Sequence, residues 1–89
     1  MIRFRGPGAE ALRVASLDLF TAVYHRASGI THLLAAPAPE ILAALAGEWL
    51  SADALLARLS EDYALADADP GVLQSRLDEL VAAGLVEAA

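Results

Sequence analysis

Residues 17–34 read LDLFTAVYHRASGITHLL, and this stretch decides the fold class of the chain. Its first part, residues 17–26, is rich in β-branched and aromatic residues, which favour strands. Ser28-Gly29 is typical of a turn, and residues 30–34 predict a second strand. The stretch therefore predicts a β-hairpin, and the apolar–basic alternation of residues 12–14 predicts a third strand beside it.

The sequence after the hairpin predicts three helices of about 8 to 14 residues each. The first begins around Pro39 and ends at Gly47, because proline suits a first helical turn and glycine often follows a last one. Ser51 is a good N-cap for the second helix, which ends near Tyr63. Asp69-Pro70 is the clearest start signal in the chain, since Asp can cap the third helix and Pro fits its first turn.

These elements together predict an α+β domain, in which a three-stranded antiparallel β-meander is followed by three helices with winged helix-turn-helix-like spacing. A chain of 89 residues is enough for one small domain. The Gly/Pro-punctuated residues 1–11 predict a flexible N-terminal segment, and residues 12–89 the domain itself. The N-terminus lacks the apolar core of a signal peptide, and no apolar run is long enough to span a membrane, so we expect a cytoplasmic protein with no membrane partner.

Charge is distributed unevenly along the chain, whose formal net charge is −6. Residues 1–36 hold four Arg against two acids, a net of +2, whereas residues 37–89 hold two Arg against ten acids, a net of −8. Nucleic-acid binding relies on clustered cations, which the C-terminal half lacks. The chain has no cysteine, so disulfides, cysteine-containing zinc sites and thiol nucleophiles are excluded.

Residues 23–34, VYHRASGITHLL, resemble the strand–turn–strand signature of PqqD-like proteins. The closest resemblance is to the peptide-chaperone subgroup found in systems with an HPr-kinase-related protein. In that subgroup a Tyr-His-Arg strand end, a Ser-Gly turn and a Thr-His-Leu-Leu strand are typical. The resemblance covers roughly residues 12–87, and two positions depart from its pattern: Ile30, where the turn usually carries Asp, and Ala35, where a polar residue is usual.

The resemblance implies a RiPP recognition element, a non-catalytic domain that binds the leader of a ribosomally made precursor peptide and presents it to a modifying enzyme. The leader would add as an extra strand to the edge of the sheet, beside the third helix. No cofactor is implied. The expected peptide-binding residues are Thr31, His32, Leu33 and Leu34 on the last strand and Val72, Leu73, Arg76 and Leu80 on the third helix.

The residues themselves support an open edge. The last strand of a meander, here residues 30–35, is unpaired on one side and can template an incoming strand. No charged side chain occurs between Ala27 and Pro37, whereas protected edges usually carry charge or proline. Arg76 is the only cation of the third helix and could meet a peptide carboxylate. The same edge would also allow a homodimer, so a small dimeric adaptor that docks onto a partner enzyme is an alternative function.

The two histidines and the turn serine suggest two specific hypotheses, a metal site and a catalytic triad. A two-residue turn at Ser28-Gly29 would place His25 opposite His32, whereas a bulge at Gly29 would break that pair. A zinc site needs three or four ligands, so two imidazoles alone predict no metal. Ser28 lies in a hairpin turn rather than at a strand-to-helix elbow, so a triad with His32 and Asp18 is not expected, and neither is enzyme activity.

The helix-turn-helix spacing is also compatible with an alternative function, that of a winged-helix DNA-binding protein. Its recognition helix would span residues 71–79, from which only Gln74, Ser75 and Arg76 could reach base edges. Two acids, Asp78 and Glu79, follow at once and would repel the phosphate backbone. We therefore expect no nucleic-acid partner. Trp49 is expected to fill the core between the first two helices, and Leu73, Leu77 and Leu80 more often serve a core than a ligand.

Overall fold

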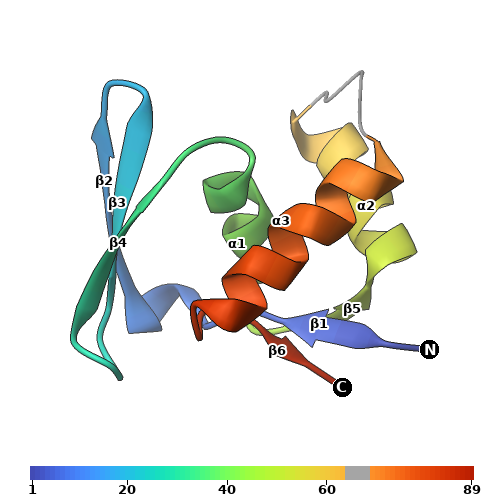
Figure 1. The fold of residues 1–89 in the computed structure, drawn as a ribbon, viewed down its shortest axis with the longest axis horizontal. Helices are drawn as coiled ribbons and strands as arrows, with labels where there is room; N and C mark the ends of the chain where they lie inside the picture. The colour runs from blue at the N-terminus through green and yellow to red at the C-terminus, as the bar shows by residue number, and fades with distance from the viewer. Residues whose placement is uncertain (64–68) are drawn as a thin grey trace.

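The computed structural model describes residues 1–63 and 69–89, with the side chains of residues 62 and 63 left aside. In these residues the chain is a mixed α+β protein, with six strands in two antiparallel sheets and three α-helices (Figure 1). The elements in chain order are β1 (Arg3–Arg5), the 3-10 helix η1 (Ala9–Ala11), β2 (Leu12–Leu17), β3 (Phe20–His25), β4 (Ile30–Leu34), α1 (Ala38–Leu45), β5 (Trp49–Ser51), α2 (Ala52–Tyr63), α3 (Pro70–Ala82) and β6 (Glu87–Ala88).

The predicted meander is present as a sheet of order β2-β3-β4. β4 occupies the predicted residues 30–34, but the prediction of one strand over residues 17–26 is wrong at its start. Leu17 ends β2 and pairs with Phe20, so Asp18 and Leu19 form a two-residue turn. Asp18 has φ 50°, a left-handed conformation that Asp tolerates better than most residues because its short side chain can bond locally.

The connection from β3 to β4 is longer than a two-residue turn. His25 pairs with Ile30 and Val23 pairs with His32, so residues 26–29 form the loop. Gly29 adopts φ 71° there, and its N–H donates to the His25 carbonyl oxygen at 2.8 Å. The two-residue reading is therefore excluded, and the two histidines do not oppose each other.

A second sheet has the order β5-β1-β6 and was not predicted from the sequence. The N-terminal strand lies at its centre, and Arg3 exchanges two backbone hydrogen bonds of 2.8 and 2.9 Å with Ala89. Phe4 is only 4% exposed and belongs to the core. Residues 1–11 thus include a core strand and η1, in contrast to the flexible segment that their glycines and prolines predict.

The helices begin and end close to the predicted residues. The Asp69 carboxylate accepts a hydrogen bond from the Gly71 N–H at 2.8 Å, with Pro70 in the first turn of α3, as predicted. The Ser51 hydroxyl accepts from the Ala54 N–H at 3.2 Å and caps α2. α1 ends at Leu45, and its C-cap residue Ala46 takes a left-handed conformation with φ 31°.

One apolar cluster joins the helices to both sheets. Val23 is buried on the inner face of the meander, and Leu12 and Leu34 pack partly buried against the cluster beside it. Trp49 is 40% exposed and lies under the guanidinium of Arg5, 5.9 Å from the ring centroid, rather than in the core as predicted. The fully buried side chains come from all parts of the cluster: Val23, Ile41, Leu45, Leu55, Leu59, Leu77 and Leu85.

Candidate functional site

β4 is an edge strand. Within residues 1–63 and 69–89 it pairs with β3 on one side, and its other side is open. This strand carries four of the expected binding residues, which are Thr31, His32, Leu33 and Leu34. No Asp, Glu, Lys or Arg occurs between Ala27 and Pro37, so the edge lacks the acidic and basic side chains that usually protect an exposed strand.

The backbone groups that face the open edge follow from the hydrogen-bond alternation. Arg26 donates its N–H to the Ala11 carbonyl oxygen at 3.0 Å, in register with the β2–β3 ladder. Bonded and non-bonded pairs alternate in an antiparallel ladder, so the even-numbered residues of β3 bond to β2 and the odd-numbered ones bond to β4. The partners of the latter are the even-numbered residues of β4. The N–H and C=O groups of Thr31 and Leu33 therefore point to the open edge.

The side chains of β4 alternate between two faces of the meander. His32 and Leu34 are half-buried on the inner face, and Leu34 packs against the core. Thr31 and Leu33 lie on the outer face, where Leu33 is 65% exposed. The four strand residues are therefore together, two on each face, and a strand added at this edge would pass both pairs.

The four expected residues of α3 divide into two groups. Val72 is exposed, and Arg76 is half-buried with its guanidinium 2.7 Å from the Glu79 carboxylate. Leu73 and Leu80, which are expected to bind peptide, are instead buried with Leu77 in the core. Their spacing along the helix forms the periodic apolar stripe by which α3 packs.

No side-chain hydrogen bond or ion pair between α3 and β4 is found in the described part of the chain. A cavity of about 340 Å³ lies instead at the turn before β4 and the C-terminal end of α3. Its lining includes Ala27 from the turn, Leu85 from the segment after α3, and three polar side chains: Arg5, His25 and Glu87.

Sequence reasoning missed Arg5 and Glu87 as site residues. They come from β1 and β6, which pair in register at these two positions. No local pattern could reveal this, because the two residues are 82 positions apart in the numbering and each strand is too short to show alternation. The cavity places an arginine, an imidazole and a carboxylate at one end of the open edge.

His25 and Ser28 form a local turn contact. The His25 Nδ1 and the Ser28 Oγ are 2.9 Å apart, and Ile30 donates its N–H to the same hydroxyl at 3.3 Å. The turn serine thus orders the start of β4. In the described residues no group of three His, Asp or Glu side chains is arranged to hold a metal ion. No helix in those residues is both long and apolar enough to cross a membrane.

Polar side chains on the surface of α3 contact acidic side chains of the same helix. Arg76 pairs with Glu79, and the Gln74 amide donates to the Asp78 carboxylate at 2.9 Å. Of the three side chains named for base contacts, Gln74 and Arg76 therefore contact carboxylates, and Ser75 donates its hydroxyl to the Gly71 carbonyl oxygen. This arrangement offers no cluster of cations for a phosphate backbone.

Comparison with known proteins gives no relative: no protein family, no curated protein and no solved structure matches this chain.

Proposed function

We propose that this protein is a non-catalytic peptide-binding chaperone, which captures a precursor (leader) peptide by β-strand addition to β4 and presents it to a modifying enzyme. The observation that carries the proposal is the open, uncharged edge of β4, from which the backbone groups of Thr31 and Leu33 point outward. The sequence resemblance of residues 23–34 supports the same reading.

Affinity would come first from the backbone. Thr31 and Leu33 each offer one N–H and one C=O, so an antiparallel guest strand would make about four hydrogen bonds. Each contributes about 0.5–1.5 kcal/mol after water is displaced. These bonds are independent of the guest's sequence, so selectivity must come from side chains.

Selectivity would come from the two faces of the edge. Guest side chains on the inner side would pass the apolar and imidazole groups of Ile30, His32 and Leu34, and those on the outer side would pass Thr31 and Leu33. Apolar guest residues at alternate positions suit this surface. The cavity lined by Arg5, His25 and Glu87 would receive a polar or charged guest residue beyond the β3–β4 turn.

The proposal includes the finer architecture and the cellular location. The order α1, β5, α2, α3, β6 supports a winged helix-turn-helix-like arrangement, with β6 beside β1 after the last helix. A cytoplasmic location is consistent with a peptide made on the ribosome. The DNA-binding alternative finds no support in the carboxylates around Gln74 and Arg76.

The experiment begins with a display selection of random 15-residue peptides on the full-length protein, followed by titration of the selected peptides into the ¹⁵N-labelled protein. We expect the amide resonances of Thr31 and Leu33 to shift most. The decisive variant is Leu33→Pro, because it removes an N–H that faces the open edge and leaves the β3–β4 ladder intact. We expect it to weaken peptide binding at least tenfold, since the proline ring also obstructs the guest strand.

Val14→Pro is the matched control, because it removes one outward-facing N–H from β2, the other edge of the same sheet. Peptide affinity should stay unchanged in this variant. Equal affinity of the wild type and Leu33→Pro would contradict the proposal, and so would a loss confined to Val14→Pro. If selection yields no peptide while a candidate enzyme still binds, the dimeric-adaptor alternative is favoured instead.

A further inference from the structure

The meander has a second open edge, which the proposed function does not use. Among the described strands β2 pairs only with β3. The alternation set by the bond from Arg26 to Ala11 leaves the N–H and C=O groups of Leu12, Val14 and Ser16 facing away from the sheet. Three of the six residues of β2 therefore offer backbone groups for pairing with another strand.

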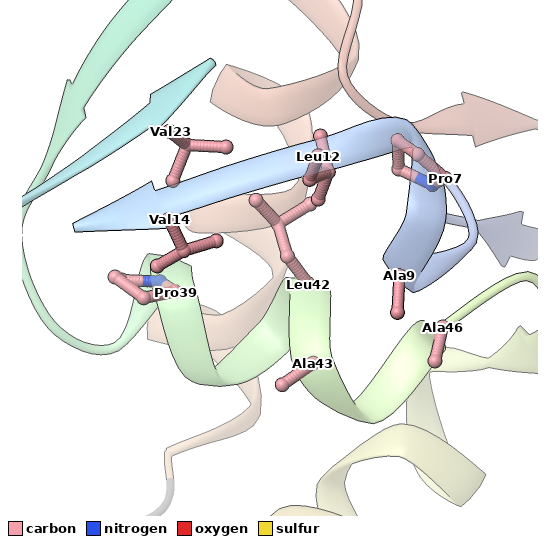
Figure 2. A pocket seen from close by; sticks show the side chains of 9 residues that line it. All are labelled: Pro7, Ala9, Leu12, Val14, Val23, Pro39, Leu42, Ala43 and Ala46. Atoms are coloured by element: carbon pink, nitrogen blue, oxygen red, sulfur yellow. The ribbon is translucent and has the colours of Figure 1, made fainter. Parts of the chain in front are cut away.

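An apolar cavity of about 280 Å³ lies on the inner side of this edge, between β2 and α1 (Figure 2). Leu12 and Val14 extend from β2 toward α1, and Leu42 extends from α1 toward β2 in the same view. Val14 is 62% exposed although it lines the cavity. The lining is apolar throughout: Pro7, Ala9, Leu12, Val14, Val23, Pro39, Leu42, Ala43 and Ala46.

We propose that the β2 edge is the interface between two copies of this chain, which pair β2 with β2 in antiparallel orientation to form one continuous six-stranded sheet. The two-fold axis passes through Ala15. Val14 of each copy therefore lies opposite Ser16 of the other copy, which gives two such pairs per dimer. The outward-facing groups of these residues then make four backbone hydrogen bonds. The inner faces lie on the same side, so the two apolar cavities adjoin across the axis.

Charge complementarity selects a second copy as the occupant. Arg13 is the second residue of β2, near its N-terminal end. Asp18 follows directly after the C-terminal end of β2, in the β2–β3 turn. In the antiparallel pairing Arg13 lies opposite Leu17 of the second copy and therefore beside Asp18 of that copy, twice per dimer. Neither residue has an ion-pair partner in the described part of its own chain. A two-fold copy meets this pattern automatically.

Helix geometry agrees with this interface. Pro39 and Ala43 of α1 and the C-cap residue Ala46 line the cavity outside the core and are small, so the two α1 helices can approach closely. The β4 edges lie at the two ends of the six-stranded sheet, where each remains free for a peptide.

The test is sedimentation equilibrium of the full-length wild type, Val14→Pro and Leu33→Pro. We expect the wild type and Leu33→Pro to dimerise with equal affinity, and Val14→Pro to dimerise at least tenfold more weakly. Ser16→Pro removes another outward-facing N–H of β2 and serves as a second variant if Val14→Pro does not fold. This pattern is the reverse of the one expected for peptide binding, so failure of either proposal is recognised separately.

The antiparallel register has its own test. Arg13→Glu places acids at both ends of the interface, and Asp18→Lys places cations there, so each variant alone should dimerise several-fold more weakly at low salt. Their mixture should form a heterodimer that is tighter than either homodimer, as measured by native mass spectrometry. A wild type that stays monomeric at about 100 µM overturns the proposal, since weak interfaces are populated at that concentration. A dimer lost in Leu33→Pro but kept in Val14→Pro and Ser16→Pro overturns it as well.

Discussion

Phe4 ties the N-terminal strand to the rest of the molecule. It pairs with Leu50 of β5 and Ala88 of β6, and its ring belongs to the central apolar cluster. Its neighbours Arg3 and Arg5 are exposed, so the strand contributes a single side chain to the core. This one ring therefore anchors β1 to the apolar core, in addition to the backbone hydrogen bonds that β1 makes with its neighbouring strands.

Replacement of Phe4 by Ala should lower the free energy of unfolding by about 3–5 kcal/mol, because it removes a buried aromatic ring and leaves a cavity. Urea denaturation followed by Trp49 fluorescence or circular dichroism measures this change. Ile2→Ala is the control, since Ile2 is exposed and should change stability by less than about 0.5 kcal/mol. A Phe4→Ala protein as stable as the wild type would return the segment to its predicted flexible role.

The elements whose boundaries are marked by residues close in sequence are the ones that the sequence predicts correctly. α3 begins where Asp69 and Pro70 predict, because a cap and a fixed φ act within one helical turn. β4 also matches its prediction, since Ser28-Gly29 ends the preceding strand locally. The boundary between β2 and β3 was missed, because Asp18-Leu19 is not a typical turn pair and the apolar pattern runs across it.

Loss of the α3 cap gives an element-scale prediction. Asp69→Ala should lower the free energy of unfolding by about 0.5–2 kcal/mol, because the Gly71 N–H loses the carboxylate that accepts its hydrogen bond. Thermal unfolding followed by circular dichroism at 222 nm measures the loss. Asp69→Asn keeps an acceptor oxygen at the cap and should restore most of the stability. Equal losses in the two variants would show that the cap bond is not the cause.

The whole molecule depends on its two chain ends meeting. β1 lies between β5 and β6, and Arg3 bonds to Ala89 in both directions, so the sheet holds together the start, the middle and the end of the chain. The meander, by contrast, is built from residues close in sequence and packs on the cluster through few side chains, Val23 foremost. Local pairing therefore forms the binding edges, and long-range pairing supports the body that carries them.

Truncation tests this dependence. Deletion of residues 1–5 removes the central strand and Phe4, and it should abolish cooperative thermal unfolding, since small domains have only about 5–15 kcal/mol of stability to lose. Deletion of residues 1–2 alone removes exposed side chains and should leave the melting temperature within a few degrees of the wild type. Indistinguishable melting curves for the two truncations would contradict the central place of β1.

The candidate site was predicted in part. β4 and its uncharged edge follow from residues 27–37 alone, because turn chemistry and the alternation of side chains are local properties. The positions of Leu73 and Leu80 do not follow in the same way, since an apolar helical residue can serve either a core or a groove until the neighbouring helices are placed. The cavity beside Arg5 and Glu87 depends on strands from both ends of the chain.

The α+β class, the three helices with the caps of α2 and α3, and the strand with an open edge all follow from the sequence, because capping, proline and glycine effects and periodicity act over a few residues. The register that sets His25 opposite Ile30 is also local, but two turn geometries fit Ser28-Gly29 equally well until the hairpin is seen. The second sheet around residues 3–5 and the apolar cavity between β2 and α1 follow only from the fold, because they rest on contacts between parts of the chain that are far apart in sequence.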